Sequence, residues 1–265
     1  MKDAALVAFV APDGEDWRFS FIKMEYKFNE KGKVKEKFTP ARRYSFLVGK
    51  HETSHTAQSR LLPLLLDDEG QPTLKDLEDT FSIEKTTKEF FEKYRDLFLG
   101  LKEALDTIVE KDQKIKVEFK RKQVSVVDFA KKLLGQIVFL YFLQKKGWFG
   151  VQRGCPWGSG SKHFLRELFD KKHGDYENFF NDILEPLFYE ALRLERPADY
   201  YKHFDCRIPF LNGGLFDPIN DYDWIETEIL LPDELFSNDR HTKEDDVGDG
   251  ILDCLLYTSP SPRDS

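Results

Sequence analysis

The stretch that decides the fold is SVVDFAKKLLGQIVFLYFLQKKG, which runs from Ser125 to Gly147. Ser125 can cap a helix, and Asp128, three residues later, can reach back to it. The two lysines near the end suit the negative end of the helix dipole, and the final glycine readily adopts the left-handed conformation that ends a helix. The stretch therefore predicts a helix of about 21 residues and about 30 Å.

The two halves of this predicted helix differ in polarity. Up to Ile137 the apolar residues recur on one side, whereas Val138 to Leu143 is apolar on every side. Its later turns must therefore be covered all round, and the rest of the fold has to pack against it. The longest uncharged run, Leu133 to Gln144, is far shorter than the roughly 20 residues that cross a bilayer. We expect a core helix and no membrane partner.

The composition is that of a soluble globular protein. The chain has 265 residues, of which 40% are hydrophobic and 33% charged, so it can hold one large domain or two ordinary ones. It begins with a short alternating apolar run instead of the long apolar run of a signal peptide, and we expect a cytoplasmic protein. Cysteines at positions 155, 206 and 254 lack the paired spacing of a zinc site or a disulfide framework.

The net charge of −8 conceals segments of opposite sign. Residues 1–50 contain 11 basic and 7 acidic residues, residues 111–132 contain 8 and 3, and residues 217–253 contain 2 and 13. The basic stretches Lys31 to Arg43 and Lys111 to Lys122 could follow the phosphates of a nucleic acid. A solvated hairpin and a solvated helix linker carry such charge equally well, so the pattern leaves both interpretations open.

The N-terminal part predicts β-structure. Ala5 to Val10, Trp17 to Phe28 and Tyr44 to Val48 alternate between apolar and polar residues and are separated by turn signals. We expect an antiparallel β-meander. A helix over Thr53 to Leu66, bent or broken near Pro63, and a polar loop over 67–72 should follow it.

The remainder predicts helices. A second long helix is expected over Glu84 to Val109, and a basic connection over 111–122 joins it to the helix that begins at Ser125. After a glycine-rich loop we expect helices at about 162–172 and 175–193, the latter interrupted or restarted at Pro186, whereas 197–218 is hard to assign. The predicted fold class is α+β, an N-terminal antiparallel β-meander followed by a mostly α-helical domain, with domains over 1–70 and 71–253.

The last twelve residues, CLLYTSPSPRDS from Cys254 to Ser265, differ abruptly from what precedes them. They resemble the translation of a sequencing adapter that was read straight through, so we exclude 254–265 from functional reasoning. The alternative is a natural disordered tail rich in serine and proline. On the adapter interpretation, the natural protein continues past Asp253.

Pro12-Asp13 and Glu25-Tyr26-Lys27 spell the PD-(D/E)xK signature of metal-dependent nucleases, in which carboxylates gather divalent ions. Along one extended strand, however, Asp13 and Glu25 would lie about 35 to 40 Å apart, too far to share a metal. A sharp bend would be needed to bring them together. We therefore prefer an ordinary hairpin.

Three further patterns have simpler interpretations. The loop 155–160 invites comparison with the cofactor loop of methyltransferases, but that loop should follow an apolar strand, and here it follows a predicted helix. His51 and His55 have the i, i+4 spacing of zinc ligands without a third ligand nearby. Cys206, near His203, lacks a recognisable catalytic triad. We therefore expect no catalytic, cofactor-binding or metal-binding residue in this sequence.

Four stretches, taken in order, resemble the amino-terminal region of bacterial type IIG restriction-modification enzymes and the related adenine-specific DNA methyltransferases. The resemblance spans nearly all of residues 1–253, and its last two stretches are the most specific. The four are Trp17 to Phe21 with Arg43 to Gly49, the helix from Ser125 with its end Leu143 to Trp148, Trp157 to Gly160 with Phe164 to Phe169, and Ile208 to Phe216.

The resemblance implies a parent enzyme that transfers a methyl group from S-adenosylmethionine to adenine in specific double-stranded DNA sequences, with or without cleavage of unmethylated sites. Mg²⁺ would serve only a nuclease domain. The family's Asn-Pro-Pro-Tyr motif is absent from this sequence, so no catalytic or cofactor residue is carried over. We expect an inactive helical connector whose methyltransferase and target-recognition domains follow in the same chain. The alternative is a non-enzymatic helical interaction domain of a multi-protein assembly.

In such a connector, we expect contacts to the DNA backbone from basic residues, and these contacts should weaken steeply with salt. The candidates are Arg42, Arg43, Lys120, Arg121 and Lys122. We also expect part of the apolar second half of the central helix to be uncovered, so that the chain aggregates or binds hydrophobic dye.

Overall fold

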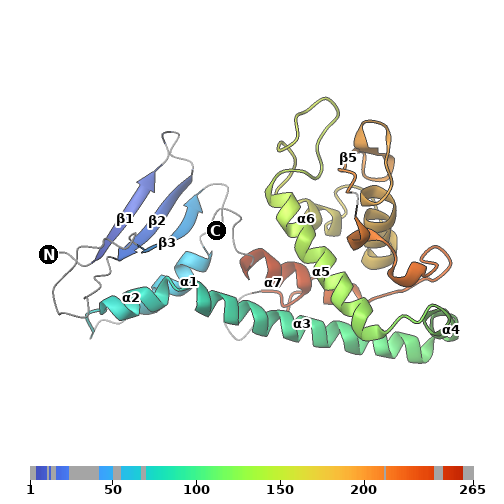
Figure 1. Ribbon diagram of the computed structural model, residues 1–265, viewed down its shortest axis with the longest axis horizontal. Coiled ribbons are helices and arrows are strands. Elements are labelled where there is room, and N and C mark those ends of the chain that lie inside the picture. Colours follow the sequence, from blue (N-terminus) through green and yellow to red (C-terminus); the bar gives the residue numbers. More distant parts are fainter. Residues whose placement is uncertain are drawn as a thin grey trace, which may run out of the picture. The chain divides into compact units, whose positions relative to one another are not determined.

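The computed structural model describes residues 4–10, 12, 16–23, 42–49, 55–66, 70–211, 213–241 and 247–258 (Figure 1). The chain divides into two compact units, one built on Met1–Phe91 and the other on Glu92–Ser259. The expected α+β class, with a β-meander first and helices after it, is confirmed. None of the helices within the described ranges combines the length and the apolarity needed to cross a bilayer.

The first unit contains a three-stranded antiparallel sheet. Strands β1 (Ala4–Val10), β2 (Asp16–Lys23) and β3 (Arg42–Gly49) lie side by side in sequence order, and β2 is central. Successive side chains of a strand point to opposite faces, so Phe21 is buried on one face of β2 and Ser20 on the other. Helix α1, His55–Leu66, follows the sheet and contains a proline at position 63.

Aromatic packing joins the sheet to helix α2 (Leu74–Thr80). Phe81, directly after α2, is buried, and its ring centroid lies 5.8 Å from those of Phe19 and Phe21 and 4.7 Å from that of Phe46. These contacts place α2 with the sheet. The first unit therefore extends beyond the expected boundary at residue 70.

Helices dominate the second unit. Helix α3 runs from the first unit into the second, and α4, α5 and α6 follow it; α7 comes last in the described chain. Between α6 and α7 lie two π-helical segments, two strands of two residues each and several 3₁₀ turns. The bounds are α3 Ile83–Lys111, α4 Gln113–Arg121, α5 Val126–Lys145, α6 Phe164–Phe169, η1 Phe179–Leu184, η2 Leu187–Leu192, β4 Tyr200–Tyr201, β5 Cys206–Arg207 and α7 Ile251–Thr258.

Helix α4 corrects one expectation, because the basic segment 111–122 is a helix and not a connection. Asp112 begins it by accepting hydrogen bonds from the N–H groups of Lys114 and Ile115 at 2.8 and 3.1 Å. Ile115 and Phe119, four residues apart, bury one side of it. The many lysines conceal this helical spacing in the sequence.

The other predicted helices differ from the structure in detail. The helix expected at 162–172 is the shorter α6. The helix expected at 175–193 is the continuous helical run 179–192, in which η1 and η2 are π-helical and Glu185 and Pro186 between them are α-helical. The expected interruption at Pro186 is therefore wrong, because the proline has helical dihedral angles and the helix continues through it. The unassigned stretch 197–218 forms β4, β5 and 3₁₀ turns.

Helix α5 confirms the central prediction. Ser125 caps it by accepting the N–H of Asp128 at 3.0 Å, and the hydroxyl of Ser125 donates to the Asp128 carboxylate at 2.7 Å. Its buried side chains come from both halves of the helix: Phe129, Ala130, Leu133, Leu134, Gln136, Ile137, Leu140, Tyr141, Leu143 and Gln144.

The second half of α5 is partly uncovered, which confirms the expectation that part of its apolar surface stays open, and the all-round cover that its sequence calls for is not provided by the described residues. Phe139 and Phe142 remain 38% and 44% exposed, whereas Leu140 and Tyr141 between them are buried. The helix therefore carries an apolar core side and an aromatic outer side.

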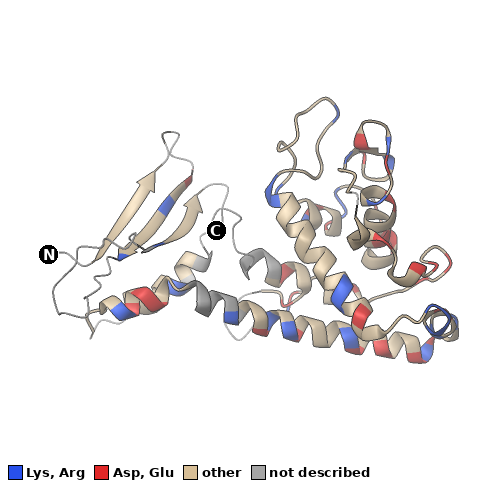
Figure 2. Ribbon diagram, viewed as in Figure 1, with Lys and Arg blue, Asp and Glu red and all other residues tan. Residues whose placement is uncertain are grey.

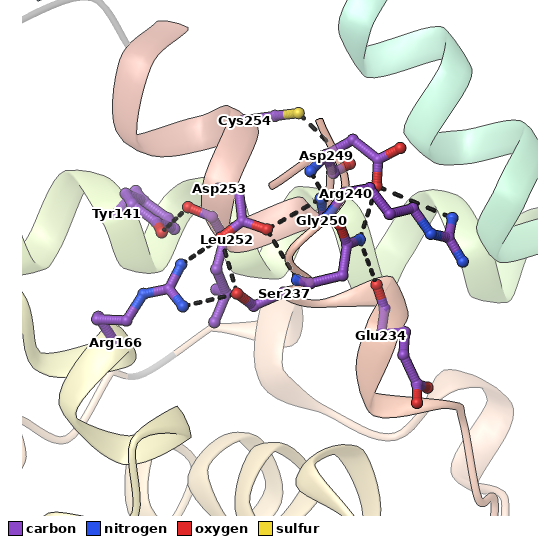
Figure 3. A network of polar contacts seen from close by, with 11 residues as sticks. Tyr141, Arg166, Glu234, Ser237, Arg240, Asp249, Gly250, Leu252, Asp253 and Cys254 are labelled. Carbon is purple, nitrogen blue, oxygen red and sulfur yellow. Dashed lines mark hydrogen bonds and ion pairs between the residues drawn. The ribbon is translucent and has the colours of Figure 1, made fainter. Parts of the chain in front are cut away.

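A polar network anchors the start of α7 (Figure 3). The Asp253 carboxylate accepts the N–H groups of Asn238 and Gly250 with one oxygen, and the Ser237 hydroxyl and Arg166 guanidinium with the other. The Tyr141 hydroxyl of α5 donates to the carbonyl of the residue before Asp253 at 2.8 Å. The chain up to Asp253 is thus an integral part of the second unit. Helix α7 continues across the expected boundary at this residue to position 258.

Candidate nucleic-acid interface

Helix α4 presents a cationic face to solvent, and it is mostly blue in Figure 2. The residues that are three or four positions apart on its other face are buried. The exposed face carries Lys114, Lys116, Lys120 and Arg121, and Lys111 precedes it at the end of α3. A row of cations on one side of a rigid helix is suited to a polyanion backbone.

Glu118, the acidic residue within α4, is turned away from this face. It is 8% exposed, and one of its carboxylate oxygens accepts the N–H of Asp223 at 3.0 Å. The other oxygen accepts the Nε–H of Arg121 at 2.8 Å. The Asp223 N–H and the Arg121 guanidinium hold the pKa of Glu118 below its usual range, so the carboxylate stays charged and engaged. The outward charge of α4 is therefore positive along its whole length.

The predicted contact residues belong to both units. Arg42 and Arg43 lie on β3, and the guanidinium of Arg43 sits 5.7 Å from the centroid of the Phe9 ring; nothing is described of the Arg42 side chain. Lys120 is exposed, and Lys122 is half-buried directly after α4. The remaining candidate, Arg121, is 62% exposed although it pairs with Glu118. Of the five, Lys120 and Arg121 lie on the exposed side of α4.

Acidic residues limit this surface at the C-terminal end of α4. The Asn220 side chain donates to the carbonyl of Gln123 at 3.1 Å, and the neighbouring Asp221 and Asp223 are exposed. Lys132 of α5 lies on the acidic side, where its Nζ donates to the Gly214 carbonyl at 3.3 Å. Burial lowers the pKa of Lys132, and Asp217 and Asp221 partly oppose this shift. Lys132 is therefore a packing residue and not part of the basic face.

The glycine-rich loop 155–160 is a tight turn against the end of α5. The N–H groups of Gly158 and Gly160 both donate to the carbonyl of Gly147, at 3.1 and 2.9 Å. A Cβ added to Gly160 would lie 1.9 Å from the carbonyl oxygen of Phe149, and one added to Gly147 would lie 2.3 Å from the carbonyl oxygen of Gly158. The glycines allow this backbone approach, and their N–H groups already donate within the protein instead of facing a cofactor.

Cys206 does not have the surroundings of a nucleophile. Its side chain is 3% exposed, and burial raises the pKa of the thiol to about 12, so it is not a thiolate near neutral pH. His203 is exposed and its ring stacks on Tyr201 at a centroid distance of 6.0 Å. The structure thus gives no catalytic pair at this position.

The proposed metal motifs fall largely outside the described residues. Asp13, Glu25 and His51 are not described, and neither is the side chain of His55. In the part of the chain that is described, no three His, Cys, Asp or Glu side chains gather in a way that could hold a metal ion.

A buried acid between η1 and η2 has no counterpart among the sequence-based candidates. Glu185 is 0% exposed, and the hydroxyl of Tyr222 donates to one of its oxygens. The hydroxyl of Tyr189 lies 3.2 Å from that of Tyr222, whereas the second oxygen of Glu185 has no partner among the described residues. Burial raises the pKa of Glu185 well above its ordinary value, although the Tyr222 bond opposes this. The carboxyl is enclosed by the fold and does not face solvent.

The sequence signal for Glu185 is its position as one acid amid Ile183, Leu184, Leu187 and Phe188. Such an acid in an apolar run suggests burial but does not reveal which partners it meets.

No protein-family model, no curated protein and no solved structure matches this chain.

Proposed function

We propose that this chain is the helical connector of a bacterial restriction-modification protein, and that the exposed face of α4 binds the phosphate backbone of double-stranded DNA. The observation that carries the DNA contact is the orientation of α4. Its lysines face solvent while its own glutamate is turned inward and neutralised by Asp223 N–H and Arg121. A cationic helix face of this kind contributes affinity without reading sequence.

The stretches that carry the resemblance to the restriction-modification family pack around one helix. In the second unit, the stretches that carry it all contact α5. Gly158 and Gly160 bind the carbonyl of Gly147 at its end, and Leu165 N–H donates to the Gln144 side chain at 3.1 Å. The Gln136 side chain donates to the carbonyl of Leu215 at 2.8 Å. The resemblance thus rests on residues that build the fold around one helix.

The parent enzyme would methylate adenine with S-adenosylmethionine, and residues 1–253 would supply none of its catalytic groups. Reading the genomic frame past Asp253 tests this part. A downstream Asn-Pro-Pro-Tyr supports the methyltransferase, and a stop codon directly after Asp253 would remove it.

The DNA contact is tested with the chain itself and a labelled duplex, by fluorescence anisotropy over a series of salt concentrations. The test variant combines Lys114→Gln, Lys116→Gln and Lys120→Gln. Arg121 is kept because its removal would strip the buried Glu118 carboxylate of a partner. We expect weaker binding and a salt slope that is smaller by about 0.9 for each phosphate that the variant no longer neutralises.

A matched control combines Lys75→Gln, Lys88→Gln and Lys172→Gln, which remove the same charge from exposed positions outside α4. This control should retain most of the binding. Equal losses in both triple variants would show that only net charge matters and would remove the assignment to α4. Absence of binding at low salt would remove the DNA contact altogether.

A further inference from the structure

Cations pair with aromatic rings at the C-terminal end of α5 and on segments that follow it. Lys146 Nζ lies 5.7 Å from the ring centroid of Phe142, and the Arg153 guanidinium lies 3.5 Å from that of Tyr200. A third pair brings the Arg207 guanidinium within 4.1 Å of the Trp157 ring. Each of these distances lies within the range of a cation–π interaction.

Backbone contacts join the segments that carry these pairs, and on this ground we treat the pairs as one surface. The N–H of Gly158, next to Trp157, donates to the carbonyl of Gly147, next to Trp148. The N–H of Arg207 donates to Val151 at 2.8 Å, and Figure 1 shows the loop between α5 and α6 beside β5. We call this surface the aromatic–cation patch; it comprises Phe142, Lys146, Trp148, Arg153, Trp157, Tyr200 and Arg207.

The rings of the patch are unusually open for their size. Trp148 and Trp157 are 40% and 39% exposed, and Phe142 is 44% exposed. Side chains this large and apolar are usually covered more fully in a soluble protein, and a cluster of them marks a binding surface.

The cations of the patch have two different roles. Arg207 donates to the carbonyls of Ala198 and Cys155 at 3.1 and 2.9 Å, so its guanidinium is fixed and holds the Trp157 ring in place. Lys146 and Arg153 are exposed and carry their charge at the surface. The nearby carboxylates are engaged: Asp205 accepts the Tyr200 hydroxyl, and Asp199 lies 4.0 Å from Arg207. The patch therefore offers flat apolar faces beside positive charge.

We propose that the aromatic–cation patch binds unpaired nucleotides of a single-stranded nucleic acid. Single strands expose the faces of their bases, which stack on aromatic side chains, and their phosphates meet neighbouring cations. A duplex hides the faces of its bases, and an apolar protein partner would gain nothing from the cations. The patch lies at the opposite end of α5 from α4, about 30 Å away along the helix, and is independent of the function proposed for α4.

The test uses the whole chain and a labelled oligothymidylate of about 15 nucleotides, long enough to span one site of this kind. Anisotropy should show binding that weakens with salt, and an unlabelled duplex of equal length should compete poorly. Phe142→Ala and Trp157→Ala should each lower the affinity at least about fivefold, whereas Trp157→Phe should retain most of it. Lys146→Gln with Arg153→Gln should lower the salt slope.

Ile225→Ala is the matched control, because it truncates a side chain that is 69% exposed in the same unit but outside the patch. It should leave the affinity for oligothymidylate unchanged. Thermal unfolding of every variant separates weaker binding from defective folding, and Phe142→Ala keeps the test decisive if Trp157→Ala unfolds.

Absent binding of oligothymidylate, or unchanged affinity in the Phe142→Ala chain, would overturn the proposal. Equally strong competition by the duplex would overturn it as well. Duplex binding that disappears in the α4 triple variant while oligothymidylate binding persists supports two separate surfaces. If the chain binds oligothymidylate but not the duplex, the DNA contact proposed for α4 is wrong and the proposal for the aromatic–cation patch stands.

Discussion

Glu185→Gln is expected to flatten the dependence of the stability of the second unit on pH. The wild-type carboxyl is fully buried, one of its oxygens accepts the Tyr222 hydroxyl, and the other has no partner among the described residues. Glutamine has nearly the same shape, and its carbonyl can still accept the Tyr222 hydroxyl. The substitution therefore removes the ionisable proton and little else.

The sign follows from the raised pKa. Folded Glu185 keeps its proton at pH values where the unfolded chain has lost it, because burial raises the pKa from its ordinary value of 4.5. The contribution to stability is complete below that value and is lost as the pH rises toward the raised folded-state pKa. Within that window, linkage removes about 1.4 kcal/mol of unfolding free energy per pH unit.

The assay is urea unfolding of wild type and Glu185→Gln between about pH 5 and 8, with the free energies extrapolated to water. Tryptophan fluorescence reports on this region because the Trp224 ring lies 5.5 Å from that of Tyr189 in the same network. The stability difference should shift in favour of the variant by about 1.4 kcal/mol for each pH unit in the window. In the variant, an amide N–H without a partner would lower the unfolding free energy by about 1–3 kcal/mol at every pH. The test therefore compares how steeply the unfolding free energies change with pH and not their absolute values.

Glu195→Gln provides the control, because Glu195 is an exposed acid near the end of the same helical region. It should leave the slope unchanged. Parallel curves for wild type and Glu185→Gln would refute the reasoning, since a buried acid that keeps its proton must produce the difference.

Two further predictions concern packing. Gly160→Ala should destabilise the second unit by more than about 2 kcal/mol, because the new Cβ would lie 1.9 Å from a carbonyl oxygen. Gly135→Ala in α5 should instead stabilise this unit by about 0.5–1 kcal/mol, because nothing lies within 4 Å of the added Cβ. Thermal unfolding midpoints that move in the same direction for both glycines would contradict this. Replacing Phe139 and Phe142, which are 38% and 44% exposed, with glutamine should reduce binding of a hydrophobic dye and aggregation. An unchanged dye signal in the folded double variant would place the exposed apolar surface elsewhere.

The prediction of α5 succeeded because its signals are local. Ser125 and Asp128 form the cap that their spacing predicts, and the helix ends at Lys145. The β-meander was equally accessible, since alternating side chains and intervening turns act over a few residues. By contrast, α4 was missed because its three lysines and its arginine dominate its composition, while only Ile115 and Phe119 mark its apolar buried side.

The candidate interface was only partly predictable. The sequence pointed to Lys120, Arg121 and Lys122, but it could not show that Glu118 turns inward to Asp223, more than a hundred positions later. Nor could it show that Arg207 holds Trp157, because that contact depends on how a late strand packs on an earlier loop. Both features depend on contacts between distant parts of the chain.

The sequence by itself determined the elements whose causes lie within a few residues: the capped helix α5 and the meander. Only the tertiary structure decided which sides of those elements are covered. It left Phe139 and Phe142 open on a helix that is apolar all round, and it enclosed Glu185 with two tyrosines. The physical reason is that burial depends on neighbours brought together from distant positions, whereas helix caps, turns and strand alternation depend on adjacent residues.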